Sequence, residues 1–498
     1  MSTNVTAERS DPLTTGGDRQ HERRWWILVV LGIAQLMVVL DTTVVNIALP
    51  SAQTALGFSN GDRQWIITAY ALSFGSLLLL GGRLGDMFGV KRIFLIGLAG
   101  FALASALGGA ATSFGMLVTA RAIQGAFGAI LAPAALSLLT TTFTNPRERS
   151  KAFGIYSAIV GSGAAIGLLL GGLLTEYLSW RWCMYVNLVF AAVAFVGGSM
   201  LLHHRISENR KPLDVPGVLL VSAGLFGLVY GFSHAETAGW SAPLTIGFLI
   251  GGAVLLVGFV LSQLRAAHPL LPLRVVLDRN RGGSYLAIFV VGVAMFGVFL
   301  FLTYYLQQTL GFSAVKSGLA FLPMTAAVVF TAQIGTNVLA RRVGPRWIIG
   351  PGMAIAAVGL WMFTRLDLTS GYVADVMPAL IVFGLGLGLT FASAMSTATA
   401  GVQHGDEGVA SAMVNTGQQV GGSIGTSLLN TIAATAITNY MGSHTPGKET
   451  VALATMHSYH VAFGVSAAIM LGGAVVAGLV LRPKVAPLSL QATQTVAL

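Results

Sequence analysis

The sequence predicts an all-α membrane protein with fourteen transmembrane helices, arranged as two six-helix bundles with two inserted helices. Hydrophobic residues make up 54% of the 498-residue chain and charged residues only 9%, a balance that would make a globular domain insoluble in water. A bilayer core about 30 Å thick requires roughly 20 apolar residues per helix, and such runs recur along nearly the whole chain. Most of the apolar surface is therefore expected to face lipid.

The apolar runs divide the chain into two bundles, an inserted pair and a linker. The N-terminal bundle, residues 25–203, has its spans at about 25–49, 64–82, 92–112, 115–141, 151–175 and 182–203. The inserted pair, residues 204–265, has spans at about 215–234 and 242–264. After a cytoplasmic linker, residues 266–283, the C-terminal bundle, residues 284–481, has spans at about 284–309, 316–340, 346–364, 374–399, 407–438 and 459–481. Polar cytoplasmic tails, residues 1–24 and 482–498, flank these elements. The first tail is expected to be disordered, and it is not expected to be a signal peptide.

The distribution of basic residues predicts the orientation. Most of the 28 Lys and Arg residues fall in the segments that share a side with the N-terminus, and such residues accumulate in cytoplasmic loops. Both termini are therefore expected in the cytoplasm, with the chain in a bacterial inner membrane. The same bias accounts for the net charge of +10 without a nucleic-acid partner. The single cysteine, Cys183, excludes an internal disulfide framework, and neither a metal nor another cofactor is expected.

Two similar segments indicate an internal repeat. GGRLGDMFGVKR, Gly81 to Arg92, follows the second span, and GTNVLARRVGPR, Gly335 to Arg346, follows the tenth. If the seventh and eighth spans are an insertion, both segments follow the second helix of a six-helix half.

Glycines recur in the fifth helix of each half. Small residues at four-residue spacing let helix backbones approach closely, which suits either a sliding contact between bundles or plain tight packing. The glycines are Gly163, Gly167, Gly171 and Gly172 in the fifth span, and Gly421, Gly422 and Gly425 in the thirteenth.

Three motifs resemble those of the major facilitator superfamily, specifically its fourteen-helix drug:proton antiporter branch of the EmrB/QacA type. LDTTVVNIALP, Leu40 to Pro50, and RAIQGAFGA, Arg121 to Ala129, are similar to the first- and fourth-helix motifs of that branch. The resemblance covers almost the entire chain, but the fifth-helix antiporter motif is only partly kept, because Leu168 stands where the family usually has proline. The signature loop after the second helix is matched by Gly82, Leu84, Asp86, Gly89, Lys91 and Arg92.

The resemblance implies a major facilitator fold and export by alternating access, with a proton gradient as the energy source and no cofactor. The expected partners are a small amphipathic substrate, protons and membrane lipids, and the expected state is a monomer. The same fold would also serve a lipid exporter, a dedicated natural-product exporter or a proton symporter. An enzyme is not expected, because the chain shows no paired carboxylates, activated nucleophile or metal ligands at membrane depth. A passive channel is also not expected, because two repeat-built halves with a cavity and one buried acid suit alternating access better than an open pore.

Asp41 and Arg121 are the candidate proton-coupling residues. Helix rise places Asp41 roughly 12 Å and Arg121 roughly 9 Å below the outer surface, on helices that run in opposite directions. Ionisable groups at this depth cost several kcal/mol unless they have a partner, a water-filled cavity or a function. The resemblance places the first and fourth helices beside the substrate pathway, so we expect Asp41 to be the protonation site beside Arg121. A permanent ion pair that only joins two helices is the alternative.

Two further groups of residues have expected roles. The resemblance makes the loop after the second span an inner gate that joins the bundles, although an ordinary charged turn would read similarly; its residues are Gly82, Arg83, Asp86, Gly89, Lys91 and Arg92. Neutral polar residues could line the substrate cavity or serve interhelical packing. The resemblance associates additional membrane carboxylates with dicationic substrates, and the second, tenth and thirteenth spans carry none apart from Glu407 at the start of the thirteenth, which favours neutral, monocationic or weakly acidic amphipaths. The neutral polar residues are Thr43, Asn46, Gln124, Asn415, Gln418 and Gln419.

Overall fold

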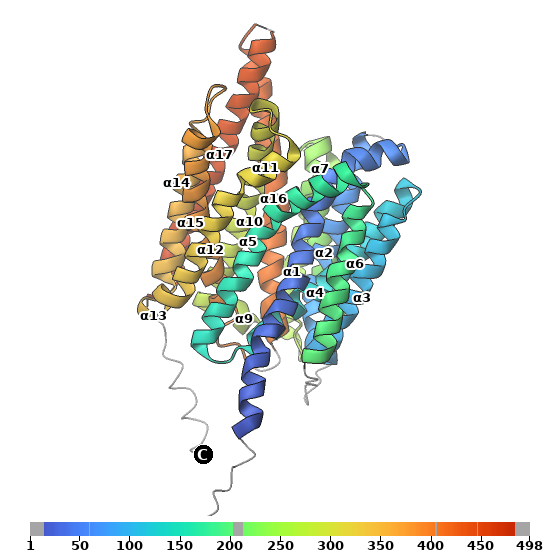
Figure 1. Ribbon diagram of the computed structural model, residues 1–498, viewed down its shortest axis with the longest axis vertical. Coiled ribbons are helices and arrows are strands. Elements are labelled where there is room, and N and C mark those ends of the chain that lie inside the picture. The colour runs from blue at the N-terminus through green and yellow to red at the C-terminus, as the bar shows by residue number, and fades with distance from the viewer. Residues whose placement is uncertain (1–13, 59, 203–212, 404–405, 446, 484–498) are drawn as a thin grey trace, which may run out of the picture.

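The computed structural model describes residues 14–58, 60–202, 213–403, 406–445 and 447–483, and the regular structure within these ranges is helical. Thirteen helices in the described part of the chain are long and apolar enough to cross a membrane. A further long helix, α5 (Pro146–Tyr177), contains the shorter apolar stretch Ile166–Tyr177 and stands among the other long helices (Figure 1). The chain is therefore a multi-pass membrane protein, and its described residues form the expected fourteen long helical elements.

The first half and the inserted pair consist of unbroken helices. The first half comprises α1 (Thr14–Leu56), α2 (Asn60–Phe88), α3 (Val90–Gly109), α4 (Phe114–Thr142), α5 and α6 (Trp182–Leu201). The inserted pair is α7 (Val215–Ala238) and α8 (Pro243–Arg265), and the linker contains the short helix α9 (Leu273–Leu277).

Three of the helical spans in the second half include π-helical turns. The second half comprises α10 (Arg279–Tyr304) with η1 (Tyr305–Thr309), α11 (Ala314–Ala320), α12 (Leu322–Ile334) with η2 (Gly335–Leu339) and α13 (Ala340–Arg342), α14 (Arg346–Phe363), η3 (Tyr372–Val376) with α15 (Met377–Ala398), α16 (Glu407–Gly442) and α17 (Lys448–Val480).

Several boundaries differ from the sequence prediction. Helix α1 begins at Thr14, so residues 14–24 of the expected disordered tail are helical. Helix α2 continues to Phe88, so the expected loop after the second span is mostly helix, and Gly89 alone separates α2 from α3. Gly89 has φ +93°, a conformation that side-chain-bearing residues rarely adopt. The boundary between residues 203 and 204 and most of the C-terminal tail lie outside the described residues.

The two halves repeat the same packing, as the two similar segments indicated. Helix α1 packs on α5 and α6, as α10 packs on α16 and α17, and α2 packs on α4 as α12 packs on α15. Across the halves, α5 packs on α11 and α12, whereas α16 packs on α2. The fifth helix of each half thus contacts the second helix of the other.

The glycines of the two fifth helices lie inside each half. A Cβ added at Gly171 would lie 3.0 Å from Val44 Cα of α1, and one at Gly425 would lie 2.6 Å from Val293 Cα of α10. Of the two alternatives, tight packing on the first helix of the same half therefore accounts for these two glycines, and a sliding contact between bundles does not.

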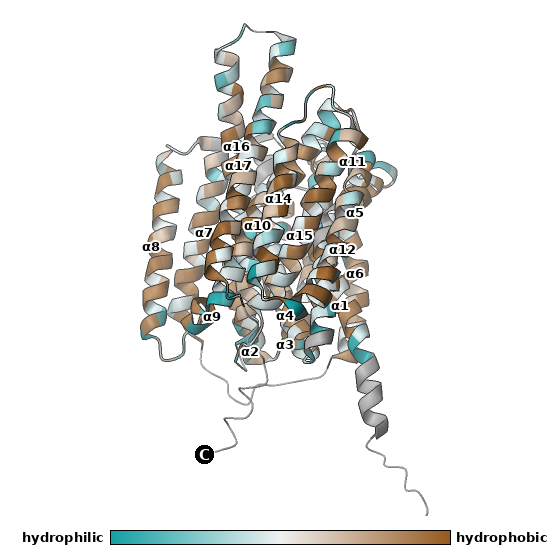
Figure 2. Ribbon diagram, turned by 90° about the vertical axis from the view of Figure 1, so that its left-hand side faces the viewer, coloured by the Kyte–Doolittle hydropathy of each residue, from teal (hydrophilic) through white to brown (hydrophobic). Residues whose placement is uncertain are grey.

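The inserted pair lies at one edge of the molecule, with α8 outermost (Figure 2). Helix α7 packs on α2 of the first half and α16 of the second, and α8 packs on α7. A core cluster joins Leu79 of α2, Leu225 of α7 and Val409 of α16. The inserted pair therefore covers the contact between α2 and α16 on that side. We call the end at which α1 begins and α17 finishes the terminal face, and the other end, where α16 and α17 project furthest, the opposite face (Figure 1).

Candidate functional site: a buried ion pair in the first half

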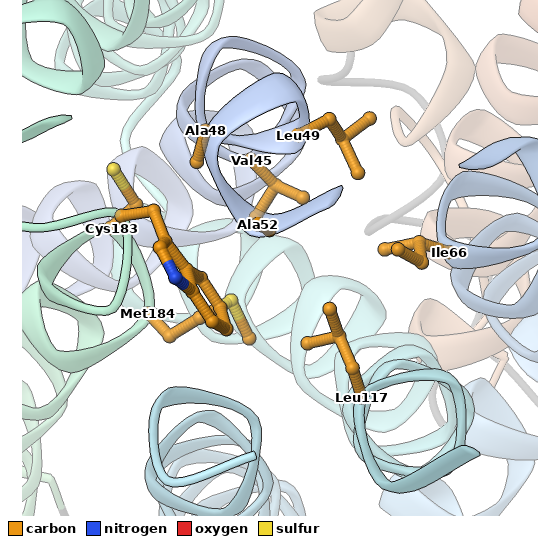
Figure 3. A pocket seen from close by; sticks show the side chains of 9 residues that line it. Val45, Ala48, Leu49, Ala52, Ile66, Leu117, Cys183 and Met184 are labelled. Carbon is orange, nitrogen blue, oxygen red and sulfur yellow. The ribbon is translucent and has the colours of Figure 1, made fainter. Parts of the chain in front are cut away.

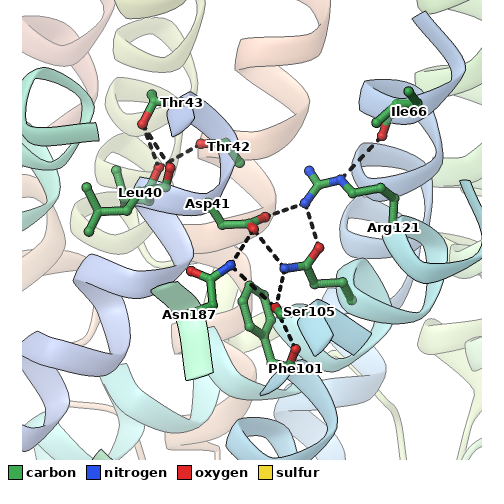
Figure 4. A network of polar contacts seen from close by, with 11 residues as sticks. Leu40, Asp41, Thr42, Thr43, Ile66, Phe101, Ser105, Arg121 and Asn187 are labelled. Atoms are coloured by element: carbon green, nitrogen blue, oxygen red, sulfur yellow. Dashed lines mark hydrogen bonds and ion pairs between the residues drawn. The ribbon is translucent and has the colours of Figure 1, made fainter. Parts of the chain in front are cut away.

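Asp41 and Arg121 meet inside the first half. Asp41 lies within α1 and has 0% of its surface exposed, and Arg121 of α4 is 2% exposed. Arg121 Nη1 donates to Asp41 Oδ2 over 2.5 Å (Figure 4). The two helices run in opposite directions, so the similar depths predicted from the sequence bring the side chains together.

Three neighbouring polar residues complete this cluster. Gln124 Nε2 donates to Asp41 Oδ1 over 2.7 Å, and Asn187 Nδ2 of α6 donates to the same oxygen over 2.8 Å. Gln124 Nε2 also lies 2.7 Å from Ser105 Oγ of α3. We refer to Asp41, Arg121, Gln124, Asn187 and Ser105 as the Asp41 cluster. The carboxylate thus accepts hydrogen bonds from residues of α4 and α6, which offsets the loss of hydration.

The guanidinium of Arg121 has further partners. Nη1 donates to Gln124 Oε1 over 2.6 Å, and Nε donates to the carbonyl of Ile66 in α2 over 3.4 Å. The guanidinium carbon lies 4.3 Å from the centre of the Tyr70 ring, a cation–π arrangement. Arg121 therefore remains partly compensated by polar and aromatic groups when the charge of Asp41 changes.

The first helix of the second half has no matching carboxylate. Asp41 lies three residues before Val44, which packs against the fifth helix of its half. The residue three before Val293, the equivalent contact in α10, is Val290.

The fourth helix shows the same difference. Arg121 lies four residues before Gly125, which packs on a carbonyl of α2. Gly384 of α15 packs on a carbonyl of α12 in the same way, and the residue four before it is Leu380. The buried ion pair thus belongs to one half alone.

An apolar cavity lies next to the Asp41 cluster (Figure 3). Val45 is one helical turn beyond Asp41, and Cys183 is one turn from Asn187. Leu117 of α4 completes that wall one turn from Arg121. The cavity gives the cluster a low-dielectric neighbour on the side of the opposite face.

The sequence prediction assigned Gln124 to the substrate cavity, whereas the structure places it, fully buried, in the Asp41 cluster. Asn187 and Ser105 were not predicted. An amide within the strongly apolar α6 was the available signal for Asn187, since polar groups in such helices need partners.

The other expected cavity residues lie elsewhere. Thr43 Oγ1 donates to the Leu40 carbonyl of its own helix over 3.0 Å, and Asn46 is exposed. Asn415 Nδ2 donates to the Ser411 carbonyl over 2.9 Å within α16. Gln418 and Gln419 are half-buried on the same helix, so these three belong to the second half.

Some of the expected gate residues join the two halves at the terminal face. A Cβ added at Gly82 of α2 would lie 2.5 Å from the Gly408 carbonyl oxygen of α16, so the two backbones touch here. Asp86 Oδ1 accepts a hydrogen bond of 3.1 Å from Gly408 N. Arg83 is buried beside them. These residues form the contact that we call the α2–α16 contact.

Lys91 and Arg92 do not bridge the halves in this structure. Lys91 Nζ donates to the carbonyls of Ser199 and Leu202 at the end of α6, over 2.8 and 2.5 Å, and Arg92 is exposed. Lys91 therefore ties α3 to α6 within the first half, because the end of α6 lies next to the start of α3.

Comparison with known proteins decides the family. Residues 31–426 match the family described as the Major Facilitator Superfamily. The chain belongs to the major facilitator superfamily.

Among the relatives of this superfamily member are proteins named for antibiotics. Puromycin resistance protein pur8 of Streptomyces alboniger is 49% identical over 457 residues, 91% of each chain. Cephamycin export protein CmcT of Amycolatopsis lactamdurans is 39% identical and matches 81% of this chain and 84% of its own. The human organic anion transporter MFSD10 (TETRAN) shares the superfamily fold, with a TM-score of 0.60, 16% identity, and coverage of 91% of this chain and 99% of its own.

Proposed function

We propose that this major facilitator superfamily member exports small amphipathic antibiotics across the bacterial cytoplasmic membrane in exchange for protons. The named relatives support the substrate class, and the Asp41 cluster supports proton coupling. Puromycin is the first candidate substrate, because the relative named for it is 49% identical over 91% of both chains. The proton gradient supplies the energy, with no metal or other cofactor, and neither nucleic acid nor a second subunit takes part.

The buried carboxylate carries the coupling proposal. Asp41 faces Arg121 in a fully buried place, so its two charge states differ strongly in their fit to the surroundings. Protonation removes the attraction that joins α1 to α4, while Gln124 Oε1 and Tyr70 continue to stabilise Arg121. A proton at Asp41 therefore changes how the helices of the first half are held, which biases the equilibrium between the two access states.

The α2–α16 contact serves as the inner gate in this proposal. The distribution of basic residues supports a cytoplasmic position for both termini and for the terminal face. Gly82, Asp86 and Gly408 then close the halves against each other on the cytoplasmic side. Their separation opens the path by which the antibiotic enters.

Transport into proteoliposomes tests this function. With an acidic lumen, wild-type protein is expected to accumulate puromycin, and Asp41→Asn is expected to lose at least about 90% of the gradient-driven part, because an amide cannot exchange the proton. Asp375→Asn, a change to an exposed carboxylate, is the matched control and should transport as wild type. Full accumulation of puromycin by Asp41→Asn would contradict the coupling role. If the wild-type protein moved a lipid and no antibiotic, the protein would be a lipid exporter.

A further inference from the structure

A cavity of about 350 Å³ opens at the opposite face between the inserted pair and the hairpin of α16 and α17. Its volume falls within the range of small-molecule sites. Trp240, which follows α7, forms one wall, and His457 of α17 another. Ile432 and Val461 add apolar surface. The site lies outside the Asp41 cluster and shares no residue with it.

The aromatic wall of the cavity is held in place by neighbouring rings. Trp240 meets Phe232 of α7 edge to face, with ring centres 5.7 Å apart and planes at 77°. His457 lies 5.4 Å from the ring centre of Tyr440, which itself stacks on His444 at 4.1 Å. These contacts fix the directions in which Trp240 and His457 present their faces, so a flat ring can stack against them without first ordering the wall.

The polar wall is the end of a long row on α16. Every fourth residue from Asn415 to Asn439 is polar, in order Asn, Gln, Ser, Ser, Thr, Thr and Asn. Residues at this spacing lie on successive turns, so the row extends about 36 Å along the helix. Its last three members, Thr431, Thr435 and Asn439, line the cavity.

The row comes near the inserted pair at two places. A Cβ added at Gly75 of α2 would lie 3.5 Å from Gln419 of the row and 3.7 Å from Val229 of α7. At the other end Trp240 faces the cavity with Thr435. Each four-residue step turns by about 40°, so the row winds around α16 on its way from the contact between the halves to the opposite face.

We propose that this cavity is a release site for the exported molecule, with the inserted pair supplying Trp240 of its aromatic wall. The proposal rests on the proposed function. Of the residues that line the cavity, His457 is the one titratable group, so the site suits a neutral or monocationic aromatic amphipath. Its rings stack on Trp240 and His457, and its polar groups bond to Thr431, Thr435 and Asn439. The inserted pair thereby gains a role in substrate handling at the outer face.

Protection of an engineered cysteine tests the site. In full-length protein with Cys183→Ala, which removes the single buried thiol, Thr435→Cys is labelled by fluorescein maleimide from the opposite face. Saturating puromycin or tetraphenylphosphonium should slow the labelling of Thr435→Cys at least threefold. Thr438→Cys, exposed on the same helix but outside the lining, is the matched control and should be unaffected. Unchanged labelling of Thr435→Cys by a probe that the same protein transports overturns the proposal, as does equal slowing at both positions.

Two further arms separate this proposal from the proposed function and from a lipid site. Asp41→Asn should keep the protection of Thr435→Cys while losing gradient-driven transport; loss of both would overturn an independent site. If neither probe is transported by the unmutated protein, the proposed function fails for these compounds instead. Labelling that changes between phosphatidylethanolamine and phosphatidylglycerol nanodiscs, and not with either probe, would assign the cavity to lipid and overturn the proposal.

Substitutions of Trp240 test the contribution of the aromatic wall to binding. Trp240→Ala should raise the probe concentration that gives half-protection at least fivefold, whereas Trp240→Phe should stay within twofold because it keeps an aromatic face. The same half-protecting concentration in Trp240→Ala and in the unmutated protein would contradict stacking on Trp240.

Discussion

Asp41 is a buried carboxylate at a position where apolar packing alone would be enough to join α1 and α4. A buried ion pair costs much of its attraction in lost hydration, so replacing both partners by apolar groups is often neutral or stabilising. The additional donors from Gln124 and Asn187 reduce that cost without removing it. A residue that is expensive for folding is most simply explained by its use in transport.

A double substitution separates the folding role of the pair from its transport role. Arg121→Leu alone leaves a buried carboxylate without its cation and should destabilise the protein by about 3–5 kcal/mol. Asp41→Asn combined with Arg121→Leu should recover most of that loss in thermal unfolding in detergent, yet remain without gradient-driven transport. Recovery of transport together with stability would show that the pair only joins α1 to α4.

Asn187 provides a milder test of the same cluster. Asn187→Leu removes one donor to the Asp41 carboxylate, and a buried hydrogen bond to a charged group contributes about 1.5–3 kcal/mol. The rate of gradient-driven puromycin transport should fall at least about tenfold while the protein still elutes as a folded species in size-exclusion chromatography. A wild-type rate would remove Asn187 from the coupling machinery.

The sequence predicted the contact of Asp41 with Arg121 because helix rise converts positions into depths. It did not predict the surroundings, because depth does not say toward which neighbour a side chain points. Gln124 lies one turn from Arg121 on the same face of α4, so its side chain reaches Asp41 and joins the cluster. Asn187 lies next to Asp41 because α6 packs on α1, and the sequence does not reveal this packing.

At the level of elements, the α2–α16 contact depends on two glycines that face each other. Gly82→Ala would put a methyl group 2.5 Å from the Gly408 carbonyl, which must push the two halves apart at the terminal face. Turnover should fall at least about fivefold while puromycin binding is retained. Gly85→Ala, one turn nearer the end of α2, meets nothing closer than 4.0 Å and is the matched control. Equal turnover of the two variants, measured in proteoliposomes, would argue against a gating role.

Element lengths show where sequence reasoning was limited. Apolar runs located each span, but they could not show that α2 continues to Phe88, because its last turns carry the charged residues Arg83 and Asp86, the second of which accepts a hydrogen bond from Gly408 of α16. For the same reason Asp86 was expected in a loop and lies on a helix. Likewise, glycine spacing predicted close helix packing, and only the placement of α5 beside α1 showed that it lies within one half.

At the scale of the whole molecule, a symmetric scaffold holds an asymmetric site. Helix packing repeats between the halves, yet Val290 and Leu380 occupy the places of Asp41 and Arg121. The inserted pair adds a second asymmetry, because it covers the contact between α2 and α16. The proposed proton coupling lies in the first half, and the proposed release site lies between the inserted pair and the second half.

The central claim is that Asp41 couples proton flow to the movement of an antibiotic. Proteoliposomes with a lumenal pH dye provide its most direct measurement, combining puromycin-driven proton flux with puromycin exchange across a membrane without a gradient. We predict that wild-type protein shows both, and that Asp41→Asn retains exchange at half the wild-type rate or more while its proton flux falls to the protein-free level. Proton flux in Asp41→Asn at the wild-type ratio to puromycin would contradict the account.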